Sequence, residues 1–228
     1  MIDPGDPVSV PARARPMIAC VTIHTSHAFS GNPIAAQHRL RYREVIAKEH
    51  WKRVYTQDGD MEFDRYDNLG TEYLICRDTA DAALGVVRST PTTLPCMLSG
   101  RFKFLLNQRL PSGPAIREAS RIVVDRTALT KEQRKPVVDR LLMALLERGL
   151  QLRLEAYVGF MLKQVWASTF LRVGWEPEWL GPEMLLRDGS GIARAGRLPV
   201  SAALRTELAT STGLHDTVLS FGDKNAGL

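Results

Sequence analysis

Charged side chains stand in four short clusters that together could carry out acid–base chemistry. The clusters are Arg41, the run "EFDRYD" at 62–67, Arg88 in "VVRST", and "REASR" at 117–121. Carboxylates can accept a proton from an amine, while arginines can bind an anionic substrate or hold carboxylates in place. Two interpretations therefore stand side by side: a structural ion-pair network, or a catalytic cleft that gathers such pairs.

The cluster "REASR" lies within the stretch 116–124, whose other residues are typical of a buried strand. Strand alternation places Glu118 and Ser120 on one face and Arg117 and Arg121 on the other, unless a bulge redirects one of them. Charges on a buried strand are costly without partners, and the acidic run supplies such partners. We therefore expect one connected polar network that includes Asp64, Asp67, Arg88 and Arg121.

Hydrophobic periodicity predicts the elements that must position these clusters. Strands are expected at 17–23, 71–77, 82–90, 116–124 and 152–158, with a short one near 183–187. Helices are expected at 32–51, 130–150 and 160–174, with shorter ones near 99–108 and 199–211. The polar, aperiodic segment 48–61 predicts a long loop. A hairpin followed by strands that alternate with helices predicts a single-domain α/β/α sandwich with a mixed sheet.

The helix expected over 130–150 carries the clearest local signals. Thr130 can act as its N-cap, and Gln133 stands where a capping box requires it. An apolar stripe follows at helical spacing, formed by Val138, Leu141, Leu142, Leu145 and Leu146. Gly149 is expected to end this helix, and Gly174 to end the next one.

The composition is that of a globular protein with a mildly basic surface. The 228 residues carry a net charge of +5, and no apolar run approaches the roughly 18 residues that span a bilayer. The stretch 1–16 is proline-rich and lacks the apolar core of a signal peptide, so we interpret it as a disordered extension before a domain over 17–228. Widely spaced Cys20, Cys76 and Cys96 favour buried apolar roles over a disulfide framework or a metal site. A cytoplasmic protein without membrane insertion is expected.

Motifs of several common chemistries are absent from the sequence. There is no GxxxxGK[ST] phosphate loop, no GxGxxG, no GxSxG and no HExxH. The Q/RxxGxG/A turn of acetyl-CoA-dependent acetyltransferases is also missing. These observations exclude no fold, but they leave the charged clusters as the features most able to support chemistry.

The ordered set of clusters resembles the LuxI-type acyl-homoserine lactone synthases over about residues 17 to 210. The matching features are "LRYREV" with Arg41, Trp51, "EFDRYD" with Glu62, Asp64 and Asp67, "GVVRSTPTT" with Arg88, "CML" at 96–98 with Phe102, "EASR" at 118–121, and "LGPEMLL" at 180–186. Two positions depart from the family pattern. Val45 stands where the family usually has Phe, and Arg117 where it often has Trp or Val, which bears on the choice of acyl group.

The resemblance implies a reaction and a fold. Family members make an N-acyl-L-homoserine lactone from S-adenosylmethionine and an acyl thioester, carried by acyl carrier protein or by CoA. The amine of S-adenosylmethionine attacks the thioester, and its carboxylate then closes the lactone and expels 5′-methylthioadenosine. The implied fold is that of the GNAT acetyltransferases, with a V-shaped opening in the sheet. S-adenosylmethionine is a substrate here, and no cofactor or metal is implied.

The resemblance also assigns candidate roles to individual residues. Glu118 and Glu62 are the catalytic candidates. The candidates for substrate binding are Arg41, Val45, Trp51, Asp64, Asp67, Arg88, Phe102, Ser120 and Arg121. Charge alone suggests a surface for the anionic acyl donor, formed by Lys131, Arg134 and Lys135.

Two other functions remain open at this point. The first is a GNAT-like N-acyltransferase that acts on a different amine, which would release no methylthioadenosine. The second is a non-catalytic basic protein that binds nucleic acid. That function predicts basic residues gathered on one surface, whereas here they are interleaved with acidic residues, so we expect no nucleic-acid partner.

Overall fold

The computed structural model describes residues 18–25, 32–47 and 56–221 of the chain. Its strands are Ile18–Thr25 (β1), Thr56–Asp58 (β2), Met61–Phe63 (β3), Glu72–Asp78 (β4), Ala83–Pro91 (β5), Ile116–Val124 (β6), Ala156–Leu162 (β7), Glu178–Trp179 (β8), Met184–Leu185 (β9), Ile192–Pro199 (β10) and Leu219–Phe221 (β11). The α-helices are Asn32–Arg41 (α1), Lys131–Gln151 (α2), Lys163–Ser168 (α3) and Ala202–Thr212 (α4). A π-helical turn at Tyr42–Ala47 continues α1, and 3-10 turns lie at Lys103–Leu105 and Leu171–Val173.

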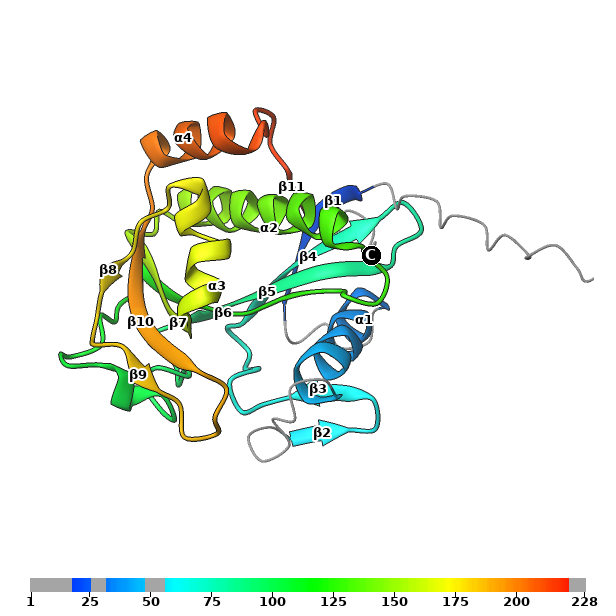
Figure 1. The fold of residues 1–228 in the computed structure, drawn as a ribbon. Helices are drawn as coiled ribbons and strands as arrows, with labels where there is room; N and C mark the ends of the chain where they lie inside the picture. The colour runs from blue at the N-terminus through cyan, green and yellow to red at the C-terminus, as the bar shows by residue number, and fades with distance from the viewer. Residues whose placement is uncertain (1–17, 26–31, 48–55, 222–228) are drawn as a thin grey trace, which may run out of the picture.

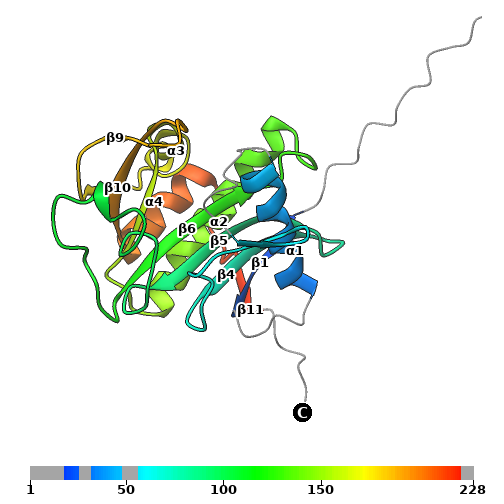
Figure 2. The same ribbon diagram turned by 90° about the horizontal axis from the view of Figure 1, so that it is seen from below.

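One mixed sheet organises the molecule. Its strand order is β11-β1-β4-β5-β6-β7-β10-β8, with β9 also paired to β10, while β2 and β3 form a separate hairpin. The pairs β1–β11 and β6–β7 are parallel, and the others are antiparallel. Helix α1 covers one face of the sheet, and α2 covers the other with α4 packed on it (Figures 1 and 2). The predicted α/β/α sandwich with a mixed sheet is confirmed.

Strands β6 and β7 separate soon after they begin to pair. Their register covers only Ile116↔Ala156 to Glu118↔Val158, although β6 runs on to Val124 and β7 to Leu162. Just beyond the last pair, a Cβ on Gly159 would lie 2.7 Å from the carbonyl oxygen of Ala119, so only glycine fits there. The strands therefore form a V whose narrow end lies at Glu118.

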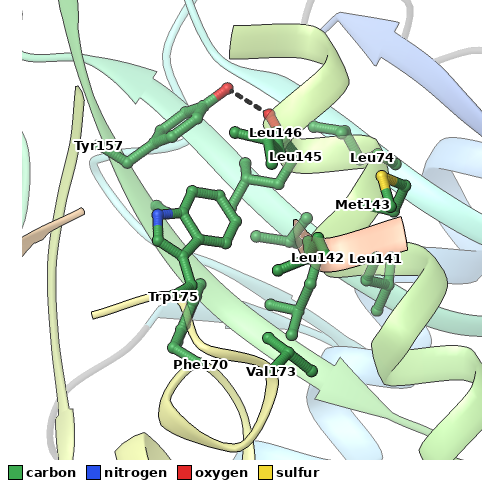
Figure 3. Packing of buried hydrophobic residues seen from close by; sticks show 14 of the residues in the cluster. Leu74, Leu141, Leu142, Met143, Leu145, Leu146, Tyr157, Phe170, Val173 and Trp175 are labelled. Atoms are coloured by element: carbon green, nitrogen blue, oxygen red, sulfur yellow. Dashed lines mark hydrogen bonds between the residues drawn. The ribbon is translucent and has the colours of Figure 1, made fainter. Parts of the chain in front are cut away.

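The largest apolar core lies between the sheet and α2. The leucine stripe of α2 packs against Phe170 and Trp175, and the Tyr157 hydroxyl donates a hydrogen bond of 3.0 Å to the carbonyl of Leu145 (Figure 3). On β4, Leu74 belongs to this core, whereas the alternate residue Tyr73 belongs to a smaller cluster beneath α1. Alternation along the central strands thus separates two differently built faces.

The start of α2 agrees with its prediction, but its end does not. The Thr130 hydroxyl accepts from the Gln133 N–H, and the Gln133 side chain accepts from the Thr130 N–H, which completes the capping box. Gly149 was expected to end the helix, but α2 continues to Gln151. A Cβ on Gly149 would lie 3.1 Å from Tyr157 and from Val200, so this glycine allows close packing within the helix.

Three other expected elements are shorter or different. The loop expected over 48–61 overlaps the β2–β3 hairpin, which turns through Gly59 and ends at Phe63. The helix expected near 99–108 is only the 3-10 turn Lys103–Leu105. The strand expected at 152–158 begins at Ala156 and extends into the region predicted as helix, because β10 pairs with β7 as far as Leu162. The helical region does end at Gly174, as predicted, in a left-handed conformation.

Within residues 18–25, 32–47 and 56–221, no helix combines the length and the apolar character that crossing a bilayer requires.

Candidate active site

A buried ion-pair network joins the N-terminal helix to the acidic run. At the end of α1, the Arg41 guanidinium donates to both carboxylate oxygens of Asp67, at 2.8 and 2.9 Å, and it also pairs with Glu62. Such a bidentate pair fixes both side chains in orientation as well as in position. Arg41 and Glu62 are both fully buried, so bulk solvent does not screen this pair.

Two further arginines connect the same acids to the central strands. Arg88 on β5 donates to Asp64 at 2.7 Å and to Asp67 at 3.0 Å. Arg121 on β6 donates to Glu62 at 2.9 Å and to Asp64 at 2.6 Å. The predicted connected network of Asp64, Asp67, Arg88 and Arg121 is confirmed as a set of contacts.

The backbone of the acidic run is folded to present its carboxylates. A turn closes between the Asp67 N–H and the Asp64 carbonyl at 3.0 Å. The Asp67 carboxylate accepts from the Asp64 N–H at 2.8 Å, and the Asp64 carboxylate accepts from the Tyr66 N–H at 2.8 Å. Aspartate favours such turns because its short side chain can bond to nearby backbone.

A bulge in β6 explains how Arg121 reaches this network. Val86 faces Val123 and Arg88 faces Ser120, so β6 has one more residue than β5 between these pairs. Arg121 takes a left-handed φ of 54° within the extra segment. Simple alternation placed Arg121 on the face opposite Glu118 and Ser120, and that expectation is wrong because the bulge redirects the side chain toward the acids. Ser120 lies beside it and accepts from the Arg88 Nε at 3.1 Å.

Arg117 does lie on the opposite face, as alternation predicts, and it faces away from the acidic run. Its guanidinium donates to the Ser89 hydroxyl at 2.7 Å and to the carbonyls of Gly70 and Ser89 at 2.9 and 2.8 Å. Its Nη2 atom lies 3.9 Å from a carboxylate oxygen of Glu72. Arg117 therefore links the start of β6 to the end of β5 and to the turn that precedes β4.

Glu118 sits at the narrow end of the V, fully buried. Its carboxylate accepts hydrogen bonds from the backbone N–H groups of Met97 at 3.1 Å and Leu98 at 2.7 Å. Burial raises the pKa of Glu118 above its ordinary value, and these N–H groups together with Arg88 oppose that rise. The residue is thus both the anchor of the 96–98 turn and a carboxylate with increased affinity for a proton.

The pKa values of Asp64 and Asp67 are shifted in the opposite direction, below the ordinary value. Burial alone would raise the pKa of Asp67, but the neighbouring Arg41 and Arg88 hold it well below its ordinary value. For Asp64, Arg88 and Arg121 likewise outweigh burial and lower the pKa. These two side chains therefore remain ionised, while Glu118 is the member of the site best suited to exchange a proton.

An apolar cluster borders the charged network on the same side of the sheet. It includes Phe102, which is buried and stacks on Phe160 with 4.0 Å between ring centroids. Val45 is half-buried and packs against this cluster and against the one under α1. Its neighbour Ile46, on the π-helical turn, is the more deeply buried of the two.

The remaining predicted residues lie apart from the network or outside the described chain. Trp51 falls in 48–55, which the structure does not describe, so its role stays a prediction. The proposed donor surface lies in the first turns of α2. There Arg134 donates to the carbonyls of Leu129 and Arg126, and Lys135 pairs with Asp139 at 2.9 Å.

Sequence reasoning missed several polar residues that support the network. The Tyr73 hydroxyl donates to Asp67 at 2.7 Å, and His38 bonds through Nδ1 to the Glu62 carbonyl at 2.7 Å. His38 also lines an apolar pocket of about 360 Å³ with Ile34, Ala35, Met61 and Phe63. The helical spacing of Ile34, His38 and Arg41 was the signal that could have identified His38 as inward-facing.

Comparisons with known proteins agree with this geometry. Residues 26–208 match the sequence model of the autoinducer synthase family. An acyl-homoserine-lactone synthase of Ralstonia nicotianae is 27% identical over 152 residues, which cover 65% of this chain and 74% of that protein. Another from Acinetobacter nosocomialis is 35% identical over 81 residues, which cover 35% of this chain and 44% of that protein.

Solved structures of such enzymes have the same fold. The CoA-dependent acyl-homoserine lactone synthase BjaI, solved with MTA, superposes with a TM-score of 0.76 at 22% identity, over 89% of this chain and 92% of that one. The synthase LasI superposes with a TM-score of 0.73 at 25% identity, over 86% of this chain and 96% of that one. The family match extends over most of the chain and includes the whole acidic network, and on these grounds the protein belongs to the autoinducer synthase family.

Proposed function

We propose that this site acylates the α-amine of S-adenosylmethionine with an acyl thioester and then closes the product to an N-acyl-L-homoserine lactone. The observation that carries the proposal is the single buried network that joins Arg41, Arg88 and Arg121 to the acidic run beside Glu118. A related synthase has been solved with SAM and isopentyl-CoA, and another with MTA and an inhibitor. Membership in the family makes the chain an acyltransferase.

The charge balance of the site suits this substrate. The network joins three arginines to three carboxylates, and Glu118 adds one further carboxylate. S-adenosylmethionine carries a sulfonium, an ammonium and one carboxylate, so it has one more positive group than negative groups. A site with one surplus negative charge therefore compensates the bound substrate in a buried region.

Glu118 is the group we propose as proton acceptor. An α-amine has a pKa of about 8 and is mostly protonated near neutral pH, so it must lose a proton before it can attack the thioester carbonyl. A buried carboxylate with a raised pKa becomes neutral as it takes up that proton. Glu62 contacts both Arg41 and Arg121, which favours an electrostatic role for it over proton transfer.

Lactone closure needs positioning more than a further catalytic group. A carboxylate oxygen of the acylated substrate bonds to its own γ-carbon while the carbon–sulfur bond breaks. Sulfur then leaves as the neutral thioether 5′-methylthioadenosine, so no external acid is needed. The protein's contribution is to hold the chain folded back on itself, which raises the effective concentration of the carboxylate.

We propose that the thioester enters through the opening between β6 and β7, with the enzyme working in the cytoplasm. The donor is either acyl-CoA or acylated acyl carrier protein, both anionic, and Lys131, Arg134 and Lys135 are proposed to meet that charge. Val45, Trp51, Phe102 and Ser120 are proposed to line the substrate site.

The test is a product assay with purified protein. S-adenosylmethionine and matched acyl-CoA and acyl carrier protein thioesters are supplied, and methylthioadenosine, free thiol and lactone are followed by chromatography and mass spectrometry. We expect the three products in equal amounts. Thiol released without methylthioadenosine would instead indicate an N-acyltransferase that uses another amine.

A further inference from the structure

The side-chain amide of a glutamine on α1 is buried without a hydrogen-bond partner among the described residues. Gln37 is fully buried, and neither its amide oxygen nor its amide nitrogen has a partner in the part of the chain that the structure describes. Within the same residues, the Nη2 atom of Arg88 and the Nε atom of Arg41 are also buried without a hydrogen-bond partner. Buried polar groups are nearly always satisfied, so each such atom requires an explanation, and a role in the chemistry of the site is one.

The position of Gln37 links it to the site already described. It stands one helical turn before Arg41, and residues four apart share a helix face. The next residue, His38, bonds to the Glu62 carbonyl, while Ile34 and Leu40 pack into the apolar cluster under α1. The neighbouring inward-facing residues of α1 therefore have structural partners, whereas the Gln37 amide has no hydrogen-bond partner in the described segments.

The unsatisfied atoms match one end of the proposed substrate. The amide oxygen of Gln37 can accept from an ammonium group, and its NH2 can donate to a carboxylate. The Nη2 atom of Arg88, which shares Asp67 with Arg41 at the end of α1, is a charged donor for a carboxylate. An amino-acid zwitterion presents both groups side by side, and S-adenosylmethionine carries one, whereas methylthioadenosine does not.

We infer that Gln37 is a substrate-binding residue that recognises the amino-acid end of S-adenosylmethionine, an inference that rests on the proposed function. Its amide is left unsatisfied in the free enzyme and is completed by the substrate. This leads to an unusual combination of effects, because removal of the amide should weaken substrate binding without destabilising the free protein.

The variant Gln37→Met tests this, since methionine has a similar length and no hydrogen-bonding amide. Calorimetric binding of S-adenosylmethionine should weaken by about tenfold to a hundredfold, the usual effect of losing hydrogen bonds to charged groups. Binding of methylthioadenosine should not change. The melting temperature of the free enzyme should stay the same or rise, because a buried unsatisfied amide has been removed. Gln37→Leu should repeat these results.

Tyr157→Phe is the matched control. It removes a fully buried polar group that has its partner, on the other face of the sheet. It should lower the melting temperature and leave S-adenosylmethionine binding unchanged.

Two results would overturn the role of Gln37 alone. One is equal weakening of both ligands by Gln37→Met, and the other is a lower melting temperature with unchanged S-adenosylmethionine binding. Failure of the wild type to bind either ligand would instead refute the proposed function, and this inference with it.

Discussion

Tyr157 and Gln37 are both fully buried polar residues, and they lie on opposite faces of the same sheet. Tyr157, facing α2, donates to the Leu145 carbonyl, and in the same core Trp175 donates to the Pro199 carbonyl at 2.9 Å. The side-chain amide of Gln37, on α1, has no hydrogen-bond partner among the described residues. On the α2 face these buried polar side chains have hydrogen-bond partners within the fold. On the α1 face, some buried polar atoms have no hydrogen-bond partner among the described residues.

This difference has a thermodynamic consequence. A satisfied buried hydrogen bond contributes about 1 kcal/mol to stability, whereas an unsatisfied group costs about 1–3 kcal/mol. The α2 face combines satisfied groups with a large leucine and aromatic core, so it supplies stability. The α1 face concentrates ion pairs and open polar atoms, which reduce stability unless a ligand completes them. Substitutions on the two faces should therefore separate activity from stability.

The largest effect is expected from Glu118→Gln. The change keeps the shape and removes the proposed proton acceptor, so kcat should fall by roughly 10²- to 10⁴-fold. The new NH2 group also faces one of the two backbone N–H donors, Met97 or Leu98, which should cost about 1–3 kcal/mol of unfolding free energy. Steady-state kinetics and chemical denaturation measure the two losses. A rate near that of the wild type at neutral pH would leave Glu118 with only its anchoring role.

The next comparison pairs Arg88→Ala with Leu142→Ala, one from each face. Arg88→Ala leaves two buried aspartates with less compensation, which should cost about 3–5 kcal/mol and abolish measurable activity. Leu142→Ala opens a cavity in the α2 core and should cost about 2–5 kcal/mol. The folded fraction of this second variant should keep its kcat/KM.

Arg88→Lys sharpens the comparison. Lysine keeps the charge but cannot bond to Asp64, Asp67 and Ser120 in the same geometry. It should therefore keep more stability than alanine and still lose most activity. If Leu142→Ala reduced kcat/KM as much as Arg88→Lys, the proposed division between the faces would be wrong.

Local signals allowed the sequence to predict one part of this architecture well. The strand over 116–124 matches β6 at both ends, and the capping box at Thr130 and Gln133 starts α2 as expected. The ion pairs between the acidic run and the arginines could be predicted from the sequence, because unpaired charges on a buried strand would be too costly.

Features that depend on distant partners could not be predicted. Arg121 reaches the acids only because β6 bulges against β5, and the bulge depends on the pairing of both strands. The run after Val158 has a helical pattern, but pairing with β10 keeps it extended to Leu162. β10 itself has few large apolar residues, so its sequence gave little signal. Gln37 carries no charge, and only the structure reveals that it is buried and unsatisfied.

A smaller effect is expected from pH through His38, which belongs to the α1 face. Burial lowers the pKa of His38 from 6.5 to about 4, helped by Arg41 and opposed by Asp67. Between pH 4 and pH 6.5, His38 therefore binds a proton in the unfolded chain but not in the folded protein. Stability should be complete above pH 6.5 and fall as the pH drops toward 4, by up to about 3 kcal/mol.

His38→Asn isolates this contribution, because asparagine can still donate to the Glu62 carbonyl but does not titrate. Denaturation midpoints measured between pH 4 and pH 6.5 should show a flatter slope for the variant than for the wild type. Parallel slopes would show that His38 is not the group that titrates.

The smallest effect is expected on the proposed donor surface, which lies outside both buried faces. Arg134 already donates to two backbone carbonyls, and Lys135 already pairs with Asp139, so few of these charges are free to meet a donor. Neutralising Lys131, Arg134 and Lys135 together to glutamine should raise KM for acylated acyl carrier protein only a few-fold, since exposed ion pairs contribute about 1 kcal/mol or less each.

The increase in KM should become smaller as salt is added, because salt screens the attraction between the donor and the enzyme. The value of kcat should not change, because this attraction takes no part in the chemical step. Arg140→Gln combined with Arg153→Gln removes charge further along α2 and just beyond it, as the control. Acyl-CoA with the same acyl group is measured in parallel, since a compact donor should respond less to charges spread over a wide surface. If the triple variant left carrier-protein turnover untouched, or if the control variant raised KM equally, the start of α2 would not be where the donor docks.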